Sequence, residues 1–303
     1  MKKLISLLLI LILALPCAAS GEASRQVVTS FYPIYLFALN LLCGVEGVEL
    51  ASLAEPTSGC LHDYQLQTSD MKALAQADVF LINGAGMEGY LDGVFEAFPA
   101  LPVVDASQGV TLLEDCTDHD HDHGDHDHKH LFNAHIWLDA ENAVLMVNNL
   151  ADGLIAALPA HAEAIAANRD AYTARLAALD AEITAALADL PHKDIITFHE
   201  AFPYFANAYG LNVAAVVNRD PDDALSPRAL AELCKLVTSL GVPPLFTEPQ
   251  YEDKAAQTIA RETGASIHTL DPIVTGPETD VPLTYYEDVM RQNLNVLLDA
   301  LGE

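Results

Sequence analysis

Basic residues are scarce in this chain of 303 residues, which has 14 Lys and Arg against 43 Asp and Glu and a formal net charge of −29 at pH 7. This balance excludes nucleic acid as a partner, because phosphate binding needs clustered Lys and Arg. Two interpretations of the acidity stay open. The charge either only keeps the protein in solution or creates a field that attracts cations.

Long apolar runs are lacking after the first twenty residues, where none approaches the roughly eighteen residues of a membrane-spanning helix. Residues 1–20 have two lysines, an apolar run and small residues, which predicts an export signal. Cys17 is a candidate lipid-accepting cysteine of a bacterial lipoprotein, although Ala14 and Pro16 fit that pattern poorly. Cleavage after Ala19 or Ser20 is the alternative. Both place the protein outside the cytoplasmic membrane, and we expect a monomer.

Cysteine is also scarce, with four residues after the predicted signal. In an oxidising compartment we predict one disulfide, with Cys43 and Cys60 as the first choice. Cys60 is two residues from His62, so a soft metal ligand is the alternative there. Cys234 lies in a predicted amphipathic helix and is expected in the core.

Glycine and proline are absent between Ala160 and Leu190, a segment rich in Ala, Leu and Glu. We predict one long linking helix over residues 159–190. Its apolar residues at helical spacing are Ile165, Tyr172, Leu176, Leu179, Ile183 and Leu187. Two packed helices with an unmarked break are the alternative. The helix would join an N-terminal lobe, residues 26–158, to a C-terminal lobe, residues 191–303.

Short apolar, β-rich runs alternate with helical stretches in both predicted lobes. They are 27–31, 48–54, 79–83, 103–105, 195–198, 213–217, 245–247 and 266–270. This alternation predicts the α/β class, with a parallel sheet flanked by helices in each lobe. Ser226 and Pro227 predict the start of one helix, and Asp139 predicts another N-cap.

Three histidines and an aspartate follow strand-like runs: His62, His135, His199 and Asp271. Ligands of open parallel sheets bind beyond the carboxyl ends of the strands, so we expect these four side chains to meet between the lobes. Neutral imidazole with carboxylate is the ligand set that zinc prefers. A lone histidine at a strand end is more often structural, but the joint placement predicts a transition-metal site.

A second metal-related feature is residues 118–130, which alternate histidine with aspartate and contain no apolar residue. Such a segment cannot pack, so we expect a mobile surface loop. It offers an auxiliary, low-affinity metal site through His119, His121, His123, His126, His128 and His130. A solvated loop that binds metal only incidentally is the alternative.

Four motifs resemble the ligand motifs of the zinc and manganese substrate-binding proteins of bacterial ABC importers. They are Gly59–Gln65, Ala134–Asp139, His199–Phe205 and Leu270–Pro272. The resemblance covers nearly the whole chain after the signal. It implies two α/β lobes joined by a rigid helix, ligands at His62, His135, His199 and Asp271, and a membrane permease as partner. Histidine rather than glutamate at the third motif, and the histidine-rich loop, are typical of the zinc branch.

Other functions fit the sequence less well than that of a Zn²⁺ receptor. A manganese receptor is disfavoured because manganese prefers carboxylate and water to three imidazoles. A zinc-dependent hydrolase with Glu200 as base is disfavoured because there is no His-Glu-x-x-His motif and Asp271 fills the fourth position. Residues 84–89 spell a dinucleotide-binding pattern, but Glu88 would repel a pyrophosphate, so a tight turn is the better interpretation.

Overall fold

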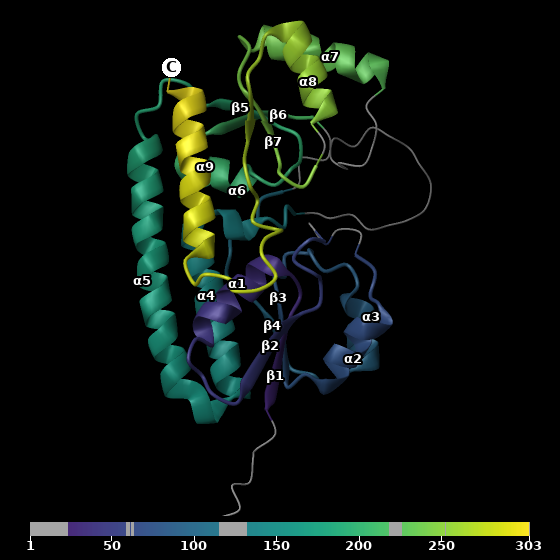
Figure 1. The fold of residues 1–303 in the computed structure, drawn as a ribbon, viewed down its shortest axis with the longest axis vertical. Helices are drawn as coiled ribbons and strands as arrows, with labels where there is room; N and C mark the ends of the chain where they lie inside the picture. The colour runs from purple at the N-terminus through teal and green to yellow at the C-terminus, as the bar shows by residue number, and fades with distance from the viewer. Residues whose placement is uncertain are drawn as a thin grey trace, which may run out of the picture.

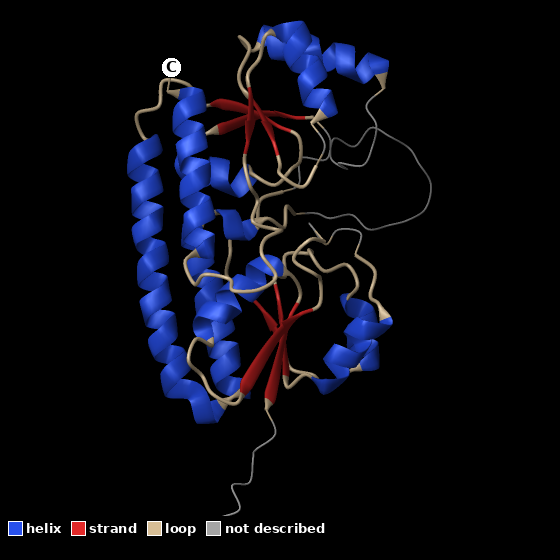
Figure 2. Cartoon of the chain, in the orientation of Figure 1, coloured by secondary structure: helices blue, strands red, loops and turns tan. Residues whose placement is uncertain are grey.

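The structure is a computed structural model that describes residues 24–58, 61, 64–114, 132–217, 226–251 and 253–302. Two four-stranded parallel sheets lie one above the other, with long helices along one side of both (Figure 1). Shorter helices cover the other side of each sheet (Figure 2). The predicted α/β class with two parallel-sheet lobes joined by a long helix is confirmed.

The lower sheet and its helices come from the first part of the chain. In order these are β1 Arg25–Thr29, α1 Tyr32–Leu41, β2 Val48–Ser52, α2 Thr68–Gln76, β3 Val79–Ile82, α3 Leu91–Ala97 and β4 Val103–Asp105. The strand order is β2-β1-β3-β4, with every neighbour parallel. Parallel pairing places the carboxyl ends of all four strands at one edge.

The upper sheet repeats this arrangement. Its elements are β5 Asp194–Thr197, α6 Pro203–Tyr209, β6 Asn212–Val216, α7 Pro227–Ser239, β7 Leu245–Thr247, α8 Lys254–Thr263, β8 Ile267–Thr269 and α9 Tyr285–Leu301. The strand order is β6-β5-β7-β8, so the second, first, third and fourth strands of the lobe lie side by side, as in the lower sheet. All eight strands therefore lie within or next to the runs predicted from the sequence.

Between β4 and β5, the described residues form two helices and two short 3₁₀ turns that connect the sheets. They are the 3₁₀ turn Ile136–Leu138, α4 Ala140–Ala157, the 3₁₀ turn Pro159–His161 and α5 Ala162–Leu187. The α5 helix is one uninterrupted helix of 26 residues, about 39 Å long at 1.5 Å per residue. Its buried residues are the six that the helical spacing predicted. The predicted N-caps are also present, since Asp139 accepts from the amides of Glu141 and Asn142, and Ser226 accepts from that of Ala229.

The C-terminal helix α9 runs beside α5, so the lobes share more than one connection (Figure 1). A single apolar core includes Val27 of β1, Leu150 of α4, Leu179 of α5, Ile195 of β5 and Leu297 of α9. Smaller clusters fill the outer face of each sheet, under α2 and α3 below and under α7 and α8 above. The lobes therefore do not have separate main cores.

Within the described ranges, no single helix is both long and apolar enough to cross a membrane. The segments Ala140–Ala157 and Pro159–Leu187 would together be long and apolar enough, but they are bent by 116° where they join.

Candidate metal centre

His135 and His199 meet between the two sheets. Their Nε2 atoms are 3.3 Å apart, and the rings meet edge to face with centroids 5.1 Å apart. His199 follows β5 in the upper sheet, and His135 comes just before the 3₁₀ turn that leads into α4. Both residues are buried, with 1% and 4% of their surface exposed. Two of the four predicted ligands are therefore in direct contact.

The spacing of these two nitrogens fits a shared metal ion. Two nitrogen ligands about 2.0–2.1 Å from one zinc ion, at the tetrahedral angle, stand roughly 3.3–3.4 Å apart. The observed separation of 3.3 Å between the Nε2 atoms matches two corners of that tetrahedron. The pair can also form a hydrogen bond in one tautomer, so the geometry permits binding without requiring it.

Asn133 holds His135 in a ligand orientation. Its Oδ1 accepts from the backbone amide of His135 at 3.0 Å and lies 3.2 Å from the ring Nδ1. A proton on Nδ1 leaves the lone pair on Nε2, the atom that faces His199. The Asn133 side chain also donates to the backbone oxygen of Glu200 at 2.8 Å, so it ties together the segments that carry both histidines. Asn133 was not among the residues predicted from the sequence, although a side-chain amide two residues before a predicted ligand was a usable signal.

Asp271 lies at the end of β8 and is fixed from several sides. Asn293 of α9 accepts from its amide at 2.8 Å and donates to its carbonyl at 2.7 Å. Its Oδ1 accepts from the amide of Ile273 at 2.7 Å. Burial raises the pKa of this carboxyl above its ordinary value, while the Ile273 amide lowers it. The group is thus held in place but costly to ionise without a nearby cation.

Trp137 links the Asp271 segment to His135. Its Nε1 donates to the carbonyl of Pro272 at 2.8 Å, and its ring lies 5.2 Å from that of His135. Tyr286 of α9 donates to the Trp137 carbonyl at 2.6 Å. Trp137 is fully buried, so this connection between the two ligand segments is rigid.

The described residues do not complete the predicted set of four. Among them no group of three or more His, Cys, Asp or Glu side chains is placed to hold a metal ion. His62, Cys17, Cys60 and the histidines of 118–130 lie outside the described residues. The four-ligand site therefore stays a prediction, of which the structure shows the His135–His199 pair and an anchored Asp271.

One expectation about His135 is wrong. The described residues directly before it, 132–134, form no strand and take part only in an isolated bridge between Phe132 and Glu114. The apolar residues Ile136 and Trp137, which follow His135, belong to a 3₁₀ turn that packs inside the common core. Apolar character alone does not separate the two cases.

Cys43 is an exposed free thiol. Its predicted disulfide partner Cys60 lies outside the described residues, so this pairing stays a prediction. Cys234 of α7 packs against the outer core of the upper sheet, as predicted.

Glu248 is an acidic residue of this region that the sequence analysis missed. It follows β7 directly and is 3% exposed. One carboxylate oxygen accepts from the Gln250 amide at 2.6 Å, whereas Oε1 has no hydrogen-bond partner among the described residues. Burial raises the pKa of this carboxyl to about 8, and the nearby charge of Asp271 adds to the shift. A charged residue directly after a buried strand was the missed signal.

The turn after β3 is closed by its own side chains. Gly84, Ala85 and Gly86 all have positive φ, and the Glu88 carboxylate accepts from the amides of Asn83 at 2.7 Å and Gly84 at 3.1 Å. These amides are the donors that a pyrophosphate would need. The dinucleotide interpretation fails for this reason.

Two lobes joined by a helical backbone, with a buried histidine pair between their sheets, define a substrate-binding protein of the metal-binding class. The family described as zinc-uptake complex component A, periplasmic, matches residues 27–300, and this chain belongs to it.

Relatives support this membership. The zinc-binding protein AdcA of Streptococcus pyogenes is 32% identical over 294 residues, which cover 91% of this chain and 56% of AdcA. This chain therefore spans little more than half of that relative. The high-affinity zinc uptake system protein ZnuA of Brucella suis is 30% identical over 322 residues, which cover 95% of both chains. A zinc-bound variant of AdcAII from Streptococcus pneumoniae has a TM-score of 0.77 and 26% identity, over 92% of this chain and 99% of that one.

Proposed function

We propose that this protein captures Zn²⁺ outside the cytoplasmic membrane and presents it to the membrane permease of an ABC importer. The observation that carries this proposal is the 3.3 Å separation of two buried imidazole Nε2 atoms, one from each lobe. The family is described as the periplasmic component of a zinc-uptake complex, and a component of that kind requires a permease partner. The protein is a receptor that binds Zn²⁺ for transport, and it is not an enzyme.

The proposed ligand set is His62, His135, His199 and Asp271. Three neutral imidazoles and one carboxylate suit zinc better than manganese, which prefers oxygen ligands. Asn133 and Trp137 support the choice, because such partners orient the ligand rings before the ion arrives. Ligation requires the imidazoles to be deprotonated, so zinc affinity falls in acid.

Three further features belong to the proposal. The protein is a monomer, Cys17 anchors it to the membrane through a lipid, and the histidines of residues 118–130 gather zinc at low affinity near His135. Relatives named as zinc-binding lipoproteins support the anchor. The composition of the histidine-rich segment supports the auxiliary role.

Native mass spectrometry of the metal-stripped protein offered equimolar Zn²⁺ and Mn²⁺ tests the proposal. We expect one tightly held zinc ion, in the full chain and in a variant lacking residues 118–130. His199→Ala should weaken zinc binding by roughly a thousandfold, because it removes one of four ligands. His192→Ala is the control, since this exposed residue lies outside the site. Retained manganese would overturn the zinc assignment, and loss of tight binding on loop deletion would overturn the ligand set.

A further inference from the structure

The segment between β8 and α9 is unusually long and irregular. Asp271 begins it and Thr284 ends it, with no helix or strand between them. We call residues 271–284 the strap. Connections longer than about 12 residues without secondary structure are uncommon inside a compact domain and usually have a function. The strap runs down from the upper sheet to the lower lobe before α9 returns upward (Figure 1).

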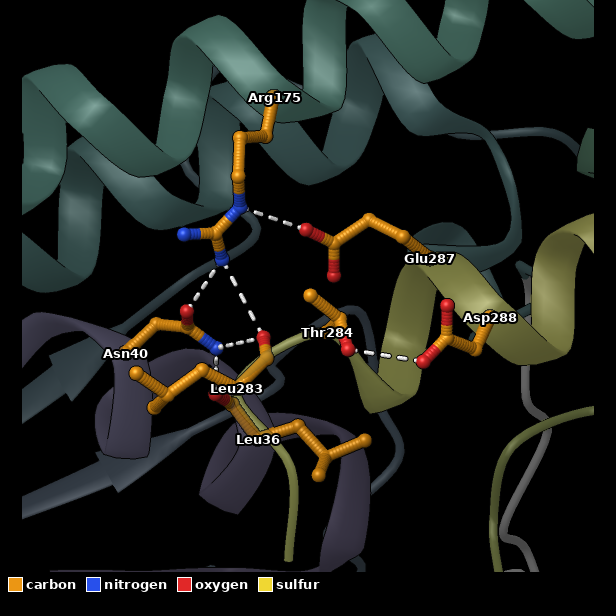
Figure 3. A network of polar contacts seen from close by, with 7 residues as sticks. All are labelled: Leu36, Asn40, Arg175, Leu283, Thr284, Glu287 and Asp288. Atoms are coloured by element: carbon orange, nitrogen blue, oxygen red, sulfur yellow. Dashed lines mark hydrogen bonds and ion pairs between the residues drawn. The ribbon is translucent and has the colours of Figure 1, made fainter.

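The lower lobe holds the strap along its length. Near its start Trp137 donates to Pro272, and near its end both Asn40 of α1 and Arg175 of α5 donate to the Leu283 carbonyl, at 3.0 and 3.2 Å. Figure 3 shows this lower anchor, where Arg175 also bonds the buried Glu287 at 2.8 Å. Asp271 therefore belongs to the upper sheet by sequence but is tied to the lower lobe by the strap.

The middle of the strap bends around Tyr32, which directly follows the Phe31 N-cap of α1. The Tyr32 hydroxyl donates to the Pro277 carbonyl at 3.2 Å, and its ring meets that of Tyr285 edge to face at 5.8 Å. Gly276 crosses the ring so closely that an added Cβ would lie 2.3 Å from the hydroxyl oxygen. No other residue type fits there without displacing the strap or the ring.

The strap also contacts the loop that leads to His62. The amide of Gly276 donates to the carbonyl of Pro56 at 3.1 Å, six residues before that predicted ligand. At its other end, the strap is strained next to Asp271: Ile273 is fully buried at φ +63°, a conformation that β-branched residues rarely adopt. Such a conformation persists only where the surroundings fix it, and the Asp271 carboxylate and the lower lobe supply that restraint.

We propose that Tyr32 and Gly276 are positioning residues for the metal site, which set the placement of Asp271 relative to the loop carrying His62. This inference rests on the proposed zinc function. Neither residue touches the ion. Their packing fixes the path of the strap, and the strap carries one proposed ligand and holds the approach to another.

Gly276→Ala tests the role, with Gly153→Ala as the matched control. An added Cβ at Gly153 of α4 would lie 2.4 Å from Val104, so it also creates a steric conflict, but inside the lower lobe and away from the strap. Zn²⁺ affinity is measured by chelator competition, and Co²⁺ absorption reports the geometry of the ligands. We expect Gly276→Ala to lower zinc affinity at least tenfold and alter the Co²⁺ spectrum. Gly153→Ala should lower the melting temperature and leave both readouts unchanged.

Tyr32→Phe is the second variant, since it removes only the hydroxyl and keeps the ring. It should fold normally and lose zinc affinity about threefold, as expected for one hydrogen bond. If Gly276→Ala folds but keeps its zinc affinity and its Co²⁺ spectrum, the positioning role is overturned and the proposed function is not. If Gly276→Ala fails to fold, the same two readouts in Tyr32→Phe decide the question. Failure of the unsubstituted protein to bind zinc would overturn the proposed function and this role together.

Discussion

Each lobe buries one carboxylate beyond the third strand of its sheet, and the two differ in how they are satisfied. Glu88, after β3, is 4% exposed and accepts from two backbone amides. Glu248, after β7, is 3% exposed and accepts only from the Gln250 side chain, with Oε1 lacking a hydrogen-bond partner in the described part of the chain. The two carboxylates are thus buried to the same extent but accept different numbers of hydrogen bonds.

This difference indicates that Glu88 has a structural role, whereas Glu248 is suited to a place near a bound cation. Burial raises the pKa of Glu88 to about 7 and that of Glu248 to about 8. Backbone amides favour the charged form of Glu88, although burial outweighs them, and the turn that Glu88 closes needs its oxygens as acceptors. Burial and the charge of Asp271 both oppose the charged form of Glu248, so a positive charge bound nearby would favour its ionisation. We interpret Glu88 as part of the fold and Glu248 as part of the electrostatics of the metal centre.

The largest expected difference is in stability. Glu88→Ala should lower the free energy of unfolding by about 3 kcal/mol, because it leaves two buried amides without an acceptor and opens a cavity. Glu248→Ala should cost less, about 2 kcal/mol, because it opens a similar cavity but leaves no buried backbone amide without its acceptor. Urea denaturation of the metal-free proteins measures both values. Equal losses would show that the two acids have the same structural role.

A smaller expected difference is in zinc affinity. Glu248→Gln keeps the shape of the side chain and removes its charge near Asp271, so affinity should fall about tenfold. Glu88→Gln is the matched control, because its carboxylate faces the β3 turn, and it should leave affinity unchanged. Chelator competition at pH 7.5 measures both. If Glu88→Gln lowered zinc affinity as much as Glu248→Gln does, the inference that only the Glu248 carboxylate contributes to zinc binding would be wrong.

The smallest expected effect is a pH dependence from Glu88. Since folding raises the pKa of its carboxyl from 4.5 to about 7, its stabilising contribution is complete below pH 4.5 and is lost as pH rises through 7. Glutamine cannot ionise, so the melting temperature of Glu88→Gln minus that of the unsubstituted protein should increase by about 2–4 °C from pH 5 to pH 6. The exposed Glu46→Gln is the control and should give a constant difference. A constant difference for Glu88→Gln would contradict the assigned pKa.

Local sequence signals predicted the fold well where the structure of a segment depends mainly on its own residues. Strands such as Val103–Asp105 and Leu245–Thr247 are short apolar runs between turn residues, and α5 lacks any helix breaker. The N-caps at Asp139 and Ser226 use local hydrogen bonds. In each case the sequence within a few residues contains the physical cause.

The sequence analysis failed where tertiary packing decides. A strand-like run was expected to end at His135, whereas the apolar residues beside it, Ile136–Leu138, form a 3₁₀ turn inside a core shared by both lobes. The return of α9 along α5 depends on contacts such as Arg175 with Glu287, which are 112 residues apart. For the site, His135 and His199 were correctly expected to meet, but Asn133 and Glu248 act through neighbours that periodicity does not identify.

The common core along α4, α5 and α9 has a thermodynamic consequence. Because one connected apolar core includes strands of both sheets, unfolding of either lobe would expose part of the packing that stabilises the other. Free energy gained when an ion binds between the lobes therefore stabilises the entire molecule, by an amount set by ion concentration and affinity. If the proposed zinc binding holds, the metal-free protein is the less stable form throughout, and its resistance to proteolysis should follow the concentration of the ion.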